Sequence, residues 1–222
     1  ALGYTQAELE HNFPEQIENV AKTEGKTLEE TLGRIRKWYN GYRFNHRAET
    51  VYNPVSVMNL FNRLEFGNYW FETGTPTFLI DLIKTKNVDL SEITSRKVNA
   101  LSFSSYEVDK LQPLALLFQT GYLTIKSFQQ KGEFRVFTLD YPNFEVESAF
   151  EAYLLDAYSN VPKERVDVFL MDLITSLENV DLDCFFKTLR IFFANIDYDI
   201  QLNNEKYYQT IFFVIFRMLG LH

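Results

Sequence analysis

Three short tracts combine large aromatic side chains with glycine or proline, and they restrict where helices can begin and end in this chain. They are Trp38–Phe44, Val51–Pro54 and Tyr69–Pro76. Glycine adopts backbone angles that other residues avoid, and proline fixes φ and removes a backbone donor. Tracts of this kind are typical of tight corners in a helical domain, so the sequence predicts a mainly α-helical fold.

Helix start signals recur along the chain. Thr5 with Glu8, and Thr27 with Glu30, have the spacing of capping boxes, while Asn53–Pro54 and Thr75–Pro76 place a cap residue before proline. Pro14 predicts a break in the first helix. Gly41 and Gly67 are predicted to end two of the helices, and apolar periodicity locates the others. One helix is expected to begin at Thr75–Pro76. The other expected helices cover residues 4–22 (broken), 28–38, 54–66, 111–120, 144–158, 163–178, 182–196 and 205–219.

A β-hairpin interrupts the helical pattern. Residues 122–128 and 134–139 alternate as strands do, and Gln130–Gly132 between them predicts a turn with glycine at the position that needs a positive φ. A helix, a hairpin and a further helix follow one another as in the last half of a winged-helix domain. Residues 84–110 have a weak pattern, interpreted as a short helix, a loop and an isolated strand. Val161–Pro162 is the predicted domain boundary.

Composition excludes several classes of function. A net charge of −8 argues against a broad non-specific nucleic-acid surface. The single cysteine, Cys184, cannot form an internal disulfide, and its phenylalanine neighbours predict a buried, inert thiol. The three histidines have no zinc-ligand spacing, and no apolar stretch reaches the length of a membrane span. We therefore expect a cytoplasmic protein with no membrane partner and no catalytic residue in this segment.

Gly25–Lys26–Thr27 resembles part of a phosphate-binding loop, but the motif fails. The first glycine of such a loop would fall at position 20, which is Val20, and no buried strand precedes it. A turn followed by a capped helix is the favoured interpretation.

A basic cluster surrounds the first aromatic tract. One interpretation is a solvated helix face whose cations pair with Glu29 and Glu30. The other is a phosphate contact, since arginine suits bidentate phosphate binding, and Arg43 is then the candidate nucleotide sensor. The cluster comprises Arg34, Arg36, Lys37, Arg43, His46 and Arg47.

The hairpin carries three cations that a winged helix could place on DNA, namely Lys126, Lys131 and Arg135. The helix before it, over residues 111–120, has no lysine or arginine, and a recognition helix without cations reads DNA poorly. Packing or docking is the alternative role of this unit.

Five blocks of the chain resemble the AAA-ATPase-like family of bacterial proteins. They are Trp38–Phe44, Tyr52–Pro54, Tyr69–Pro76, Leu116–Ile125 and Leu139–Asn143. In that family an ATPase module precedes a PD-(D/E)XK nuclease-like domain. The resemblance implies that residues 1–160 form the helical lid and winged-helix-like end of the ATPase. It also implies that residues 161–222 form a helical linker and the first helix of the nuclease-like domain.

The resemblance also implies that nucleotide and metal binding belong to other parts of the protein. ATP and magnesium would bind a nucleotide core that precedes this segment, so the segment itself needs no cofactor. Residues 205–213 resemble the first nuclease-like helix, where Glu205 would help to bind magnesium if that domain is complete and active. The expected partners are therefore the N-terminal ATPase core and the C-terminal nuclease-like domain, and the expected role is regulation and interdomain coupling. A DNA-binding winged helix and a helical interaction scaffold are the alternatives.

Overall fold

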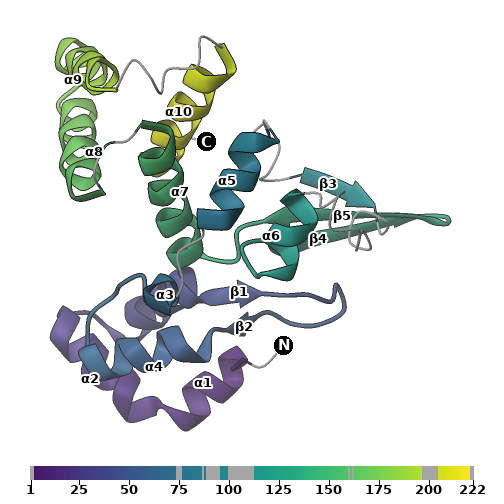
Figure 1. Cartoon of the computed structure of the whole chain (residues 1–222). Coiled ribbons are helices and arrows are strands. Elements are labelled where there is room, and N and C mark those ends of the chain that lie inside the picture. The colour runs from purple at the N-terminus through teal and green to yellow at the C-terminus, as the bar shows by residue number, and fades with distance from the viewer. Residues whose placement is uncertain are drawn as a thin grey trace. The chain divides into compact units, whose positions relative to one another are not determined.

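The structure is a computed structural model that describes residues 3–73, 77–86, 88, 96–99, 113–159, 161, 163–196 and 205–220. It is mainly α-helical with a few short antiparallel strands (Figure 1), which confirms the expected fold class. The chain divides into two compact units: unit 1 is Ala1–Leu79 with Glu92–Ala149, and unit 2 is Ile80–Ser91 with Phe150–His222. The predicted boundary at Val161–Pro162 falls inside unit 2, and the two proposed domains stay a prediction.

Four helices open unit 1, and local sequence signals explain their starts. Both predicted capping boxes are present, Thr5 with Glu8 and Thr27 with Glu30, and the chain breaks at Pro14 as expected. The Asn53 side chain accepts a hydrogen bond from the Val55 amide, and Pro54 is the first helical residue. The helices are α1 (Gln6–Asn12), α2 (Pro14–Glu24), α3 (Leu28–Tyr39) and α4 (Pro54–Arg63).

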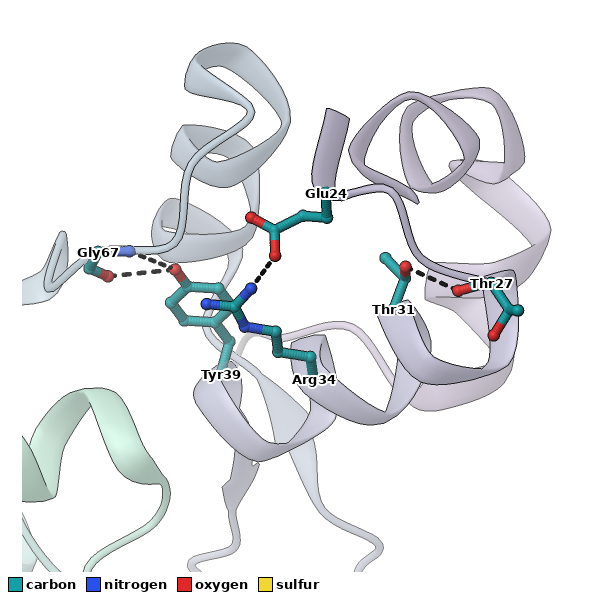
Figure 2. Close-up of polar contacts among 6 residues, drawn as sticks. All are labelled: Glu24, Thr27, Thr31, Arg34, Tyr39 and Gly67. Carbon is teal, nitrogen blue, oxygen red and sulfur yellow. Dashed lines mark hydrogen bonds and ion pairs between the residues drawn. The ribbon is translucent and has the colours of Figure 1, made fainter. Parts of the chain in front are cut away.

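Figure 2 shows the polar contacts that fix α3. Arg34 forms an ion pair with Glu24 at the end of α2, and the Thr31 hydroxyl donates to the Thr27 carbonyl, 2.8 Å away. At the other end of α3 the Tyr39 hydroxyl donates to the Gly67 carbonyl at 3.1 Å and accepts from the Gly67 amide at 3.0 Å. The apolar residues of this core include Leu9, Val20, Ile35, Tyr39, Tyr52, Val57 and Leu60.

One predicted helix end is wrong and one is confirmed. Helix α4 ends at Arg63 because Leu64 adopts a left-handed φ of 54°, so Gly67 is not its stop. The predicted end of α3 at Asn40–Gly41 is confirmed, since α3 ends at Tyr39 with Asn40 as its C-cap. The chain then continues as a short strand, β1 (Asn40–Tyr42), which pairs with β2 (Val51–Tyr52).

A three-stranded antiparallel sheet contains the predicted hairpin. Its strands are β3 (Arg96–Asn99), β4 (Thr124–Lys131) and β5 (Phe134–Asp140), in the order β3-β5-β4. Gly132 has the expected positive φ, 58°, at the hairpin turn. β3 is not isolated, since Val98 faces Phe137 across the ladder with β5. Helix α6 (Pro113–Gln119) precedes β4, and the predicted start at residue 111 lies outside the described residues.

The remaining helices are η1, a 3₁₀ helix (Trp70–Thr73), α5 (Thr77–Thr85), α7 (Phe144–Ser159), α8 (Lys163–Glu178), α9 (Leu182–Ala194) and α10 (Glu205–Met218). Helices α7 to α10 follow the predicted pattern closely, whereas the sequence pattern does not predict η1. The start signal at Thr75–Pro76 and the connector over residues 197–204 lie outside the described residues. In the described part of the chain, no helix is sufficiently long and apolar to span a membrane.

The predicted burial of Cys184 is wrong, because its side chain is exposed. The buried face of α9 is formed by Phe185, Leu189 and Phe192, which recur at helical spacing. Cys184 precedes the first of them by one residue, so it lies off that face.

Candidate functional site

The aromatic tract that follows α3 lies against β4, eighty residues later in the chain. The Arg43 amide donates to Thr124 Oγ1 at 2.6 Å, and the Arg43 carbonyl accepts from the Ile125 amide at 3.0 Å. The guanidinium continues the same pairing, with Nε donating to the Ile125 carbonyl at 2.8 Å and Nη2 to the Lys126 carbonyl. Arg43, the candidate nucleotide sensor, therefore connects the segment after α3 to β4 within unit 1. Its role in nucleotide sensing stays a prediction.

Gly41 lies in direct contact with the segment that begins α7. A Cβ atom added to Gly41 would lie 1.9 Å from the Pro142 carbonyl oxygen, and Gly41 has a φ of 127°. Neither the space nor the backbone angle accepts a larger residue. Glycine at this position therefore allows the first aromatic tract to touch the last block of the family resemblance.

Glu145 in the first turn of α7 is fully buried. Its carboxylate accepts hydrogen bonds from the Ser56 hydroxyl at 2.8 and 2.9 Å and from the Trp70 amide at 2.9 Å. Burial raises the pKa of Glu145 to about 7, although the hydrogen bonds from Trp70, Ser56 and the Tyr69 amide oppose that rise. The burial of Glu145 depends on Ser56 of α4 and Trp70 of η1, which no local signal in the sequence reveals.

Three buried polar atoms of unit 1 make no hydrogen bond of normal length and angle with the described residues: Asn40 Oδ1, the Tyr42 hydroxyl and Asn143 Nδ2. Burial and the neighbouring Glu145 carboxylate raise the pKa of Tyr42, while the side chains of Asn53 and Asn143 oppose that rise. Buried polar groups are normally satisfied, so these atoms mark an unusual polar region.

A small open pocket of about 210 Å³ adjoins this polar region. Its walls come from β1, β2, the start of α4, η1 and the end of α6. The lining residues are Tyr42, Phe44, Val51, Tyr52, Asn53, Pro54, Trp70, Gln119, Thr120 and Gly121. Pockets for drug-sized molecules span about 300–1,000 Å³, so this one suits a smaller group.

The three hairpin cations do not converge. Lys126 Nζ donates to the Pro142 carbonyl at 2.9 Å, and burial lowers the pKa of Lys126. Lys131 and Arg135 are exposed. Lys131 pairs with Phe134 and Arg135 pairs with Gln130, so the alternation of side chains along a strand puts the two cations on opposite faces.

The loop of the basic cluster packs on the hairpin. The His46 ring stacks on Phe128, with centroids 4.2 Å apart, and meets Phe137 edge-on. Phe137 and Arg135 are two residues apart on β5 and therefore share a face. His46 thus packs on the face of the hairpin that also carries Arg135.

The expected pairing of the helix cations with Glu29 and Glu30 is wrong for Arg34. Arg34 binds Glu24 and also lies 4.1 Å above the Phe66 ring. The Glu30 carboxylate accepts hydrogen bonds from the Thr27 amide and hydroxyl in its capping box, so it is less available to the cations.

The described residues contain no group of three or more histidine, cysteine, aspartate or glutamate side chains that could hold a metal ion. Glu205, the predicted magnesium ligand, opens α10, and its side chain lies outside the described part of the structure. Its metal role stays a prediction.

One curated protein is similar to about two thirds of this chain. An "uncharacterized protein in vnfD 5'region" of Azotobacter chroococcum mcd 1 is 38% identical over 141 residues, which is 64% of this chain and 25% of that protein. The match thus spans about a quarter of the relative's length. No family model matches the chain, and no solved structure matches it.

Proposed function

We propose that this chain is a non-catalytic, regulatory part of an AAA-ATPase-like protein with a PD-(D/E)XK nuclease-like domain. One observation carries the proposal: blocks that resemble the family, far apart in sequence, contact one another in unit 1. Gly41 touches Pro142, Arg43 binds Thr124 and Ile125, and the Trp70 amide binds Glu145 just after the last block. A set of residues that interlocks in this way is what a lid of fixed shape requires.

ATP and magnesium belong to the rest of the protein in this proposal. The pocket of about 210 Å³ is smaller than those that hold drug-sized molecules, so we assign the nucleotide to the ATPase core. The chain would bind the N-terminal ATPase core on one side and lead into the nuclease-like domain on the other. The single cysteine fits the cytoplasmic location that such a protein would have.

The test is an ATP–magnesium titration of the full-length protein, followed by thermal unfolding. We expect ATP to raise the melting temperature of the wild type, and we expect Arg43→Gln to abolish that rise. Because Arg43 also braces β4, the variant's melting temperature without ATP must be measured separately. Arg47→Gln, an exposed cation of the same loop, is the matched control. An unchanged ATP response in Arg43→Gln, or nuclease activity that ignores ATP, would count against the proposal.

Strand order favours a second candidate function, DNA binding by a winged helix. In the sheet, β5 lies between β3 and β4, although it is the last of the three strands in sequence. Helix α6 lies between β3 and β4 in sequence. This is the arrangement of a winged-helix sheet. The hairpin end carries exposed Lys131 and Arg135, and Phe134 is 81% exposed. Exposed cations beside an aromatic ring suit a wing that contacts a phosphate backbone.

Duplex binding measured by fluorescence anisotropy at several salt concentrations tests this second function. A variant that makes one phosphate contact fewer should show a slope of log K against log salt that is shallower by about 0.9. Lys131→Ala and Arg135→Ala should each do so, whereas Lys22→Ala, on the distant α2, should not. No salt-dependent binding by the wild type would exclude this function.

A further inference from the structure

Three aromatic rings form adjacent walls of the pocket in unit 1. Tyr42 and Phe44 are inclined by only 30°, with centroids 6.5 Å apart, and Trp70 stands nearly perpendicular to Tyr42, at 74° and 6.4 Å. The pocket thus has two roughly parallel walls and one that crosses them. Rings in this relation can surround one compact group on several sides.

Gly121 lies where the three rings meet. A Cβ atom added there would lie 3.7 Å from Trp70 and from Tyr42 and 3.9 Å from Phe44. Gly121 also has a φ of 87°, which favours glycine. The absence of a side chain at this one position leaves the space between the rings open.

The lining of the pocket favours a cation. None of the described residues that line it is charged, and its polar lining includes Asn53, Gln119 and Thr120, which offer oxygen acceptors. The faces of aromatic rings attract cations, and the described lining holds no lysine or arginine that would repel one.

We propose that Tyr42, Phe44 and Trp70 form an aromatic cage that binds the head group of an alkylated ammonium ion. The pocket volume of about 210 Å³ exceeds the space of one water molecule and suits one compact head group rather than a whole nucleotide or drug-sized ligand. Aromatic cages recognise quaternary ammonium groups in this manner. This site is independent of the proposed ATPase and DNA roles.

Matched ligands test the charge preference without altering the protein. Choline and its neutral isostere 3,3-dimethylbutan-1-ol have the same shape, and calorimetry or saturation-transfer NMR measures their binding. We expect choline to bind about tenfold more tightly, the ratio that roughly 1.4 kcal/mol of cation–π attraction produces. Equal binding of the two, or no binding of choline, overturns the proposal.

Two further experiments locate the site and identify the source of its ligand. Phe44→Leu removes one ring at a partly exposed position, so the fold should survive, and it should weaken choline binding severalfold while sparing the neutral alcohol. Phe134→Leu, at the exposed hairpin end, is the control and should change neither. Unchanged choline binding in Phe44→Leu overturns the assignment. Tighter binding of trimethyllysine amide than of choline assigns a protein side chain as the source, and the reverse order assigns a small molecule.

Discussion

Glu145 places a carboxyl group in the interior of unit 1, where Ser56 and the Trp70 amide are its hydrogen-bond donors. Its folded-state pKa of about 7 exceeds its ordinary value of 4.5. Between these two values the folded state binds more protons than the unfolded state, so the free energy of unfolding should fall as pH rises from 4.5 to 7. The group contributes nothing further above pH 7. The predicted loss is about 3 kcal/mol.

Urea unfolding at several pH values from 4.5 to 8 measures this loss. Glu145→Gln, which cannot ionise, should flatten the decline. Glu133→Gln changes an exposed acid at the hairpin turn and should leave the decline in place. Equal pH profiles for wild type and Glu145→Gln would show that Glu145 titrates normally.

Two glycines of neighbouring elements should respond in opposite ways to alanine. Gly41→Ala forces a Cβ against the Pro142 carbonyl at an unfavourable φ, so we expect it to destabilise the protein by about 3 kcal/mol or more. Gly33→Ala, on the exposed side of α3 with nothing within 4 Å, should stabilise it by about 0.5–1 kcal/mol. Chemical denaturation of both variants compares them, and similar effects would contradict the close approach at Gly41.

At the scale of the element, α3 depends on a reciprocal cap. The Thr27 hydroxyl accepts from the Glu30 amide, and the Glu30 carboxylate accepts from the Thr27 amide at 2.9 Å, which lowers the pKa of Glu30. Thr27→Ala should cost about 1 kcal/mol of unfolding free energy, whereas Thr27→Ser should keep most of the cap. Thr23→Ala, an exposed site within α2, is the control and should have little effect. Denaturant midpoints of the three variants test the order.

The elements of the hairpin show which local signals suffice. Gly132 predicts the turn because a positive φ is needed there, and the alternating pattern locates both strands to within a few residues. The sequence predicts β3 only as an isolated strand, because a four-residue strand has too weak a pattern to indicate its partner. Its pairing with β5 comes from contacts distant in sequence.

At the scale of the whole molecule, unit 2 contains a buried ion pair between α7 and α10, two helices far apart in the sequence. Arg217 Nε of α10 lies 2.7 Å from Glu151 Oε1 of α7, and the Tyr207 hydroxyl donates to the Tyr158 carbonyl. Arg217→Leu should destabilise unit 2 by about 3 kcal/mol, since it removes a cationic partner of a buried carboxylate. The second change Glu151→Gln should recover part of that loss.

Hydrogen exchange of α10 amides measures the effect within unit 2. We expect faster exchange in Arg217→Leu and intermediate exchange in the double variant. Arg190→Leu, on the exposed side of α9, is the control and should exchange as wild type does. If the effects of Arg217→Leu and Glu151→Gln on hydrogen exchange simply add, the ion pair contributes little to the stability of unit 2.

The sequence alone determined the starts of α1 to α4, the break at Pro14 and the hairpin turn, because a cap, a proline or a glycine acts on its own few residues. It also identified the tract around Arg43 as a candidate site. Only the tertiary structure decided that Arg43 binds β4, that Glu145 is buried, that Tyr42, Phe44 and Trp70 surround one pocket, and that Cys184 is exposed. These features depend on which distant segments meet, and desolvation and packing act through such contacts rather than through neighbours in sequence.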